Sequence, residues 1–266
     1  MITVTFDANT LEKATRPERC ASDALQADYL AVHAALKDGR IKGYFSQTYC
    51  TLEGIEKKDR PRVLGQTSVG SSATAPAKNT LNISITIRHH RESLNDAHSK
   101  AVQAALKLGL RALRGPARLV DGLTRSDPDK SFYAPDESTD QLIARRTRAN
   151  EVATAIDLRG VGHAIAQKLG NDFNNRADVK NKLWHQGLTR YKNIHEQRAI
   201  ERAIAEWSDG DSVASHVGYG IDFFCSNDFG KGAGGPSILS PENRAWLSKD
   251  YGVAFVTLSE LVRLIP

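Results

Sequence analysis

The chain has few cysteines and no long apolar segment. Cysteine occurs only at Cys20, Cys50 and Cys225, and no two of the three have the spacing of metal ligands. Because three thiols cannot all pair, we expect reduced cysteines and a cytoplasmic protein. No apolar run approaches the roughly 18 residues that a membrane-spanning helix needs. The first residues lack a basic stretch followed by a long apolar one, so we expect neither a secretory signal nor a membrane partner.

Several catalytic and ligand-binding motifs are also missing. The sequence contains neither GxSxG nor HExxH, the signatures of many serine hydrolases and zinc proteases. The glycine-rich segment Gly230–Gly235 lacks the GxxxxGK[ST] pattern of a P-loop, so we interpret it as a loop that borders a site. Asp127, Asp129 and Asp136 lack the spacing of a calcium loop and indicate turns. Cys50 and Cys225 fit a buried role as well as a nucleophilic one.

What is present is an ordinary globular composition with an uneven charge. Of the 266 residues 40% are hydrophobic and 25% charged, which predicts one or two soluble domains with a substantial core. The net charge is +5, yet residues 61–118 alone hold nine basic residues against Glu92 and Asp96. Such a basic region favours contact with a polyanion. A solvated helix face is the alternative explanation.

Two acidic residues bracket a buried segment near the end of the chain. Ser212 to Tyr219 predicts a short helix that opens at Asp211, and Ile221 to Cys225 predicts a buried strand that is followed by Asp228. Open α/β sheets bind ligands beyond the carboxyl ends of their strands. The two carboxylates therefore predict a cation site, although a helix cap and a turn residue would explain them as well.

Two further acids follow strands near the start of the chain. Ile2–Phe6 is a β-branched and aromatic run that ends in Asp7. Ile41–Ser46 predicts a second strand, and Gln47–Lys57 predicts a helix that carries Glu53, with Glu56 as the alternative acid. After Asp7 comes a polar stretch that ends near Pro17, and a helix is expected from Ser22 or Asp23 to about Lys37.

The middle of the chain contains further elements. Residues 59–80 predict a flexible loop, and the alternation of Leu81–His90 predicts a half-buried strand. Ser93–Leu113 predicts a helix whose basic stripe would follow a phosphate backbone; its members are Lys100, Lys107, Arg111 and Arg114. The chain is expected to be helical from Asp140 to about Trp207, and again after the N-cap Ser240.

The order of these acids resembles a PIN domain, a nuclease family with an acidic metal site. The similarity rests on a strand ending at Asp7, a strand and helix carrying Glu53, Asp211 at a helix start and Asp228 after a strand. The terminal Val253–Ile265 is similar to the last strand and short helix of that fold. The resemblance implies a three-layer α/β/α fold with a central, mostly parallel sheet. We predict a core of residues 1–57 and 136–266 and an insertion of residues 58–135.

The resemblance also implies a chemistry. Asp7, Glu53, Asp211 and Asp228 would bind Mg²⁺ or Mn²⁺ through hard oxygen ligands and cleave RNA phosphodiesters. Supporting or phosphate-positioning roles are expected for Asn9, Asp209, Ser226 and Lys231, and Asp209 competes with Asp211 for the metal role. The enzyme would be a toxin-like or RNA-processing endoribonuclease, with a protein inhibitor and a second copy of the chain as further candidate partners. A nuclease of structured or single-stranded DNA and a non-catalytic binding module are the alternatives.

Overall fold

The computed structural model describes residues 1–66, 68–77, 80–88, 95–116, 118, 131–135, 138–179, 183–230 and 236–266. The described residues form a central five-stranded sheet, in the order β5-β2-β1-β6-β7, with every neighbouring pair parallel. Its strands are β1 (Ile2–Phe6), β2 (Ile41–Ser46), β5 (Arg111–Leu113), β6 (Phe223–Cys225) and β7 (Phe255–Val256). The predicted three-layer α/β/α architecture is confirmed.

Helices cover both faces of this sheet. The helices of the described residues are α1 (Ala8–Thr15), α2 (Gln26–Lys37), α3 (Arg60–Gly65), α4 (Asp96–Lys107), α5 (Thr139–Leu158), α6 (His163–Arg176), α7 (Trp184–Gly187), α8 (Ile194–Tyr219), α9 (Pro241–Tyr251) and α10 (Leu258–Leu264). Of these, α3, α6 and α7 pack against α8 in a separate cluster. No helix among the described residues is long and apolar enough to cross a membrane. The cysteines are free thiols, as expected.

Two hydrophobic clusters define the layers. On one face Val4 and Phe45 of the sheet pack with α1, α2, α4 and α10, and on the other Phe224 packs with α5, α8 and α9. Successive strand residues point to opposite faces, so a strand with both faces covered must be apolar on both. This requirement explains why Ile2–Phe6 and Ile41–Ser46 were recognisable in the sequence.

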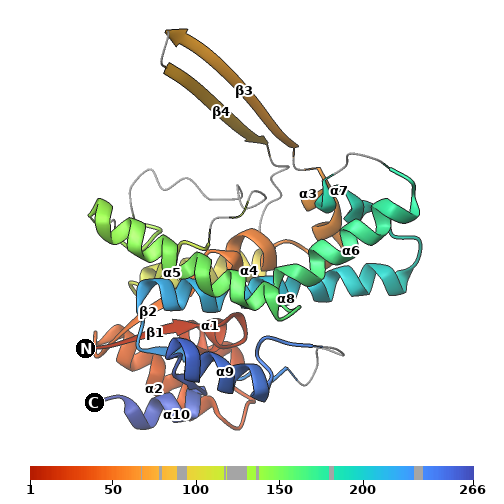
Figure 1. Ribbon diagram of the computed structural model, residues 1–266. Helices are drawn as coiled ribbons and strands as arrows, with labels where there is room; N and C mark the ends of the chain where they lie inside the picture. The colour runs from red at the N-terminus through yellow and green to blue at the C-terminus, as the bar shows by residue number, and fades with distance from the viewer. Residues whose placement is uncertain are drawn as a thin grey trace.

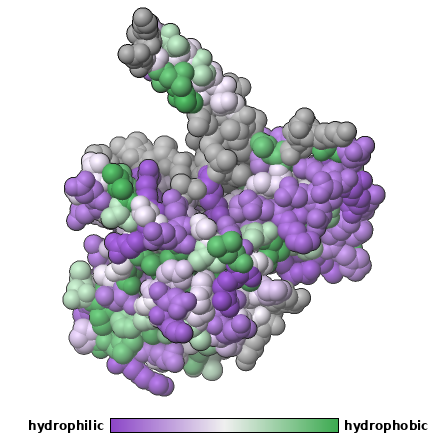
Figure 2. All heavy atoms as spheres, in the orientation of Figure 1, coloured by the Kyte–Doolittle hydropathy of each residue, from purple (hydrophilic) through white to green (hydrophobic). Residues whose placement is uncertain are grey.

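A two-stranded antiparallel hairpin projects from the helical body (Figure 1). It consists of β3 (Ser68–Ala77) and β4 (Thr80–Arg88). Leu81 and Ile83 on β4 are 64% and 65% exposed, and hydrophobic spheres are visible on the hairpin in Figure 2. The predicted strand at Leu81–His90 is confirmed as far as Arg88, and His89 and His90 lie outside the described residues. Its predicted half-burial is wrong, because the described side chains of β4 are exposed. The predicted loop at residues 59–80 contains α3 and β3.

Three other segments differ from the predicted ones. The polar stretch after Asp7, for which no helix was predicted, contains helix α1, whose N-cap Asp7 accepts a hydrogen bond from the Ala8 N–H. The expected helix at Gln47–Lys57 is one π-helical turn at Tyr49–Glu53 followed by a 3₁₀ turn at Lys57–Asp59. The expected helix at Ser93–Leu113 stops at Lys107, and Arg111–Leu113 joins the central sheet as β5.

The carboxyl-terminal half agrees more closely with the sequence. Residues from Asp140 to Trp207 are largely helical, and Ser240 caps α9 by accepting a hydrogen bond from the Asn243 N–H. The last strand and helix are β7 and α10. The division into a core and an insertion at residues 58–135 stays a prediction, although α4 and β5 within that segment pack into the core.

Candidate active site

The candidate site lies where the succession of strands reverses. From β1 the chain builds the sheet outward through β2 and β5, and then returns to the other side of β1 with β6 and β7. A crevice at the carboxyl ends of the strands is expected at such a point. Asp7 directly follows β1 and Ser226 directly follows β6, so both residues lie at this edge.

Asp7 is the most firmly held residue of the site. Its side chain is 3% exposed and accepts hydrogen bonds from the Ser226 hydroxyl at 2.7 Å, from the Ala8 N–H at 2.8 Å and from the Asn9 side-chain amide. Burial raises the pKa of Asp7, and the charge of Asp228 adds to the rise. The hydrogen bonds from Ser226 and Ala8, and the charge of Arg244, act against it.

Glu53 and Asp209 bring two more carboxylates to the same place. Glu53 ends the π-helical turn after β2 and accepts a hydrogen bond from the Ser208 hydroxyl of α8. Burial, followed by the charge of Asp7, raises the pKa of Glu53 to about 7. Burial also raises the pKa of Asp209, the next residue of α8, and the charges of Asp7 and Glu53 raise it further. These carboxylates therefore act on one another electrostatically.

Asp228 lies at the exposed rim of this group. Its backbone N–H donates to the Ser226 hydroxyl at 3.1 Å, and its carboxylate accepts from the Gly230 N–H at 2.7 Å. Its charge contributes to the raised pKa values of Asp7 and Asp209. We define Asp7, Glu53, Asp209 and Asp228 as the carboxylate cluster.

The predicted role of Asp211 is not supported by its position, because its carboxylate faces a different set of side chains. Helix α8 runs unbroken from Ile194 to Tyr219, so Asp211 is an interior residue and not the start of a helix. Arg118 donates to both oxygens of Asp211 at 2.6–3.0 Å and to Asp157 at 2.8 Å. Although burial opposes its charge, these two carboxylates raise the pKa of Arg118. The Trp207 indole N–H donates to Asp211 at 2.7 Å.

The predicted supporting residues have separate outcomes. Asn9 and Ser226 contact Asp7, as a positioning role requires, and the Asn9 side-chain oxygen accepts from the Asn227 N–H at 3.0 Å. Asp209 belongs to the cluster itself. Lys231 lies outside the described residues, and nothing is concluded about it.

The predicted basic stripe is divided between two elements. Lys100 and Lys107 are exposed on α4, seven residues apart and hence on one side of the helix. Arg111 is on β5, where its guanidinium donates to the carbonyl oxygen of Leu110 at 2.8 Å. Arg114 follows β5, and its guanidinium lies 3.7 Å from the ring centroid of Tyr133. The four residues therefore do not form one helical stripe.

Sequence reasoning missed three residues beside the carboxylate cluster. Arg244 of α9 is buried and donates to the backbone oxygens of Ser226 and Asp228. Arg60 is 5% exposed and donates to the carbonyl oxygens of Glu53 and Ile55 at 2.9 and 3.1 Å. Glu206 precedes Asp209 by three residues on α8, and this spacing is the one sequence signal that could have paired them.

The oxygen atoms of the carboxylate cluster are of the type that binds divalent cations. They are carboxylate oxygens, which Mg²⁺ and Mn²⁺ prefer, and their mutual repulsion is what a cation would relieve. Among the described residues no group of three or more His, Cys, Asp or Glu side chains is already arranged to hold a metal ion. Binding would therefore require side-chain rotation within the cluster.

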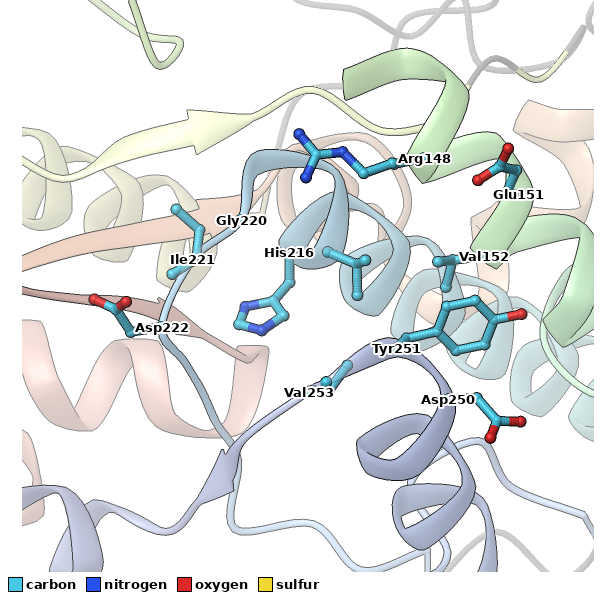
Figure 3. Close-up of a pocket in the computed structure, with 12 residues that line it drawn as sticks. Arg148, Glu151, Val152, His216, Gly220, Ile221, Asp222, Asp250, Tyr251 and Val253 are labelled. Atoms are coloured by element: carbon cyan, nitrogen blue, oxygen red, sulfur yellow. The ribbon is translucent and has the colours of Figure 1, made fainter. Parts of the chain in front are cut away.

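A separate cavity of about 630 Å³ lies at the opposite edge of the sheet, beside the start of β6 (Figure 3). Arg148, Tyr251 and Asp250 line it together with His216, whose ring is buried and lies 3.0 Å from the Thr5 hydroxyl. Burial lowers the pKa of His216 to about 3, which keeps the imidazole neutral. This cavity does not share a lining residue with the carboxylate cluster.

Comparison of the chain with protein-family models, with curated proteins and with solved structures finds no match in any of the three. The functional assignment therefore depends on the geometry and chemistry of the site.

Proposed function

We propose that the chain is a divalent-metal-dependent endoribonuclease with a PIN-like active site formed by the carboxylate cluster. The observation that carries this proposal is the convergence of Asp7, Glu53 and Asp209, which come from three distant parts of the chain. The charge of Asp7 raises the pKa values of Glu53 and Asp209, and the charge of Glu53 raises that of Asp209 further. Their place at the strand reversal of a parallel sheet supports it. Asp228 joins them at the rim, and Asp209 takes the role that the sequence suggested for Asp211.

Each residue of the site has a defined task in this proposal. Ser226 and Asn9 orient the Asp7 carboxylate through hydrogen bonds. Arg244 offsets part of the negative charge of Asp7 and Asp228. Glu53 must lose its proton to act as a ligand, and its pKa of about 7 makes that step sensitive to pH. When bound to these carboxylates, Mg²⁺ or Mn²⁺ supplies charge stabilisation at the phosphodiester and lowers the pKa of water.

The exposed cations of α4 give a second, weaker line of support. Lys100 and Lys107 present positive charge on one side of that helix, which suits the approach of a polyanion. The proposal includes a cytoplasmic location, with which the free thiols agree. A toxin-like or RNA-processing role, a protein inhibitor and self-association stay predictions from the PIN resemblance.

The test is cleavage of single-stranded RNA and DNA of one sequence, with Mn²⁺ or with a chelator. We expect Mn²⁺-dependent internal cleavage of the RNA by the full chain. Asp7→Asn should abolish it without unfolding, because asparagine also caps α1. Asp250→Asn, in the separate cavity, is the matched control and should keep full activity.

Three results would contradict the proposal. Cleavage retained by Asp7→Asn would separate the activity from the cluster. Preferential cleavage of DNA would favour the DNA-nuclease alternative. An absence of cleavage, together with an unchanged melting temperature on adding Mn²⁺, would favour the non-catalytic binding module, since a ligand that binds the native state stabilises it by mass action.

A further inference from the structure

A second cavity, of about 400 Å³, opens next to the carboxylate cluster and includes Glu53 in its lining. That volume is near the lower end of the range for small-molecule sites. Lys57, Lys58, Asn95 and His98 also line it. Because Glu53 belongs to both, a molecule in this cavity would contact the candidate active site.

Hydrogen bonds fix the wall of this cavity to Glu53. The Asn95 N–H donates to the carbonyl oxygen of Gly54 at 3.0 Å, which ties the start of α4 to the residue after Glu53. Asn95 caps α4, and its side-chain oxygen accepts from the His98 backbone N–H at 2.9 Å. Arg60 holds the carbonyl oxygen of Glu53 from the other side at 2.9 Å. The imidazole of His98 is thus placed at a set position relative to Glu53.

The same contacts determine the protonation of the His98 ring. Its Nδ1 lies 2.9 Å from the side-chain oxygen of Asn95, which also accepts the His98 backbone N–H. An amide oxygen has no hydrogen to donate, so Nδ1 must carry the proton. Burial, with the charge of Arg60, lowers the pKa of His98 and so favours the neutral ring. A neutral ring protonated at Nδ1 has a bare Nε2.

Nε2 of His98 is therefore a hydrogen-bond acceptor. Among the described residues no side chain or backbone group donates to it. The ring is held in place by Tyr49, whose ring centroid lies 4.8 Å away. A rigid, uncharged acceptor recognises a hydroxyl or an amino group of a ligand.

Two lysines at the same cavity add positive charge beside the His98 acceptor. Lys57 and Lys58 are exposed and line it, and the ammonium group of neither makes an ion pair or a hydrogen bond with another described residue. Ammonium groups bind phosphates as mobile point charges. The cavity thus combines the cations Lys57, Lys58 and Arg60 with a neutral acceptor, and its lining also holds the acidic residues Glu53, Glu56 and Glu201.

We propose that this cavity is a ribonucleotide subsite, in which Lys57 and Lys58 bind a phosphate and Nε2 of His98 accepts a hydrogen bond from the adjacent 2′-hydroxyl. The 2′-hydroxyl distinguishes RNA from DNA at a given position, and it adjoins the phosphate along the backbone. This inference rests on the proposed function and adds to it the group that selects RNA.

The test measures binding of single-stranded DNA oligonucleotides that carry one central nucleotide with a 2′-hydroxyl, a 2′-hydrogen or a 2′-methoxy group. The wild-type chain should bind the hydroxyl form about tenfold more tightly than the other two, the value of roughly one unsatisfied hydrogen bond. His98→Phe keeps a ring against Tyr49 but removes the acceptor, and should make the three affinities equal. His98→Gln keeps an acceptor and should restore part of the preference.

Lys57→Ala and Lys58→Ala serve as matched variants for the phosphate half. Each should weaken all three oligonucleotides alike and lower the salt dependence by about one contact. The inference is overturned if the wild-type chain does not distinguish the 2′-groups, or if His98→Phe keeps the preference. It is also overturned if His98→Phe changes the preference for the base while leaving the sugar preference intact.

Measuring oligonucleotide binding apart from cleavage tests this inference independently of the proposed function. A chain that selects the 2′-hydroxyl without metal-dependent cleavage would support the subsite and contradict the nuclease. A chain that cleaves RNA but keeps its selectivity in His98→Phe would do the reverse. If His98→Phe fails to fold, His98→Gln provides the comparison, and a preference that His98→Gln leaves undiminished overturns the inference. A wild-type chain that binds the hydroxyl and methoxy forms equally also overturns it, because methylation removes the donor.

Discussion

The hydroxyl of Ser226 donates a 2.7 Å hydrogen bond to the carboxylate of Asp7 across the junction of β6 and β1. Ser226 is fully buried, and its hydroxyl also accepts hydrogen bonds from the Asn9 amide at 3.2 Å and the Asp228 N–H at 3.1 Å. One small side chain therefore joins three residues of the candidate site. It directs its single proton toward a carboxylate whose pKa is raised by burial.

Removing that hydroxyl should weaken the site without dismantling the fold. Ser226→Ala takes away a bond that stabilises ionised Asp7, so the pKa of Asp7 should rise further. We expect roughly tenfold slower Mn²⁺-dependent cleavage at pH 7 and a loss of about 1 kcal/mol in the free energy of unfolding. Cleavage rates and denaturant unfolding measure the two effects. Ser259→Ala, on α10, is a control that should leave cleavage unchanged.

Asp209 and Asp211 should respond in opposite ways to the same substitution. Asp209→Asn removes a charge that its neighbours disfavour, so in chelator at pH 8 the melting temperature should not fall, while cleavage should be lost. Asp211→Asn leaves the buried Arg118 with less compensation and should cost roughly 3 kcal/mol of stability. Thermal unfolding and cleavage assays on the same two preparations test this pair. Equal loss of activity in both, at matched folded fractions, would contradict the separation.

The raised pKa of Glu53 predicts how stability depends on pH in the metal-free protein. Its pKa is about 7 in the folded chain against an ordinary 4.5, so the native state binds the proton more tightly than the unfolded state. The resulting stabilisation is complete below about pH 4.5 and is lost as the pH rises through about 7. We expect the melting temperature in chelator to fall from pH 5 to pH 8, and to fall less in Glu53→Gln.

Added Mn²⁺ should reverse the trend, since it binds the ionised carboxylates and competes with protons. The stabilisation by Mn²⁺ should therefore grow between pH 5 and pH 8. A Mn²⁺ effect that is the same at both pH values, or that persists in Asp7→Asn, would place the ion elsewhere.

The β3–β4 hairpin should be dispensable for folding. Ser68 pairs with Arg88 at its base, so the two ends are neighbours and a short Gly-Ser linker can replace residues 68–88. Its described side chains are exposed, and their removal takes no apolar area from the core. We expect a melting temperature within a few degrees of the full chain. Unfolding of the shortened chain, seen by circular dichroism, would show that the hairpin is part of the core.

The strands β1 and β2 could be predicted from the sequence because they are buried between two layers of helices and are therefore rich in apolar and β-branched residues. Strand β5 could not be, since Arg111–Leu113 offers only three residues and the edge of β2 decides their state. The sequence also identified Asp7 and Glu53, because each follows a strand that was recognised correctly.

Asp211 was misplaced because Asp209-Gly210-Asp211 resembles a break between helices. Gly210 instead lets α8 pass close to the chain at Gly162, and a β-carbon at Gly210 would lie 3.4 Å from the Gly162 α-carbon. Which of two acids faces the sheet edge depends on packing against residues far away in sequence. The contacts of Arg118 and Arg244 could not be predicted for the same reason. The sequence does not show which distant residue an arginine side chain contacts.

Helix α8 is fixed at two points, by Ser208 to Glu53 and by His216 to Thr5. Each residue turns a helix by about 100°, so Asp209 and Asp211 point in nearly opposite directions. Adding or deleting one residue between the two anchors would rotate one carboxylate out of the site and direct the other away from its arginine. The number of residues in that interval is therefore constrained even where their identity is not. A one-residue insertion or deletion within residues 208–216 should therefore be tolerated less well than one in the exposed β3–β4 hairpin.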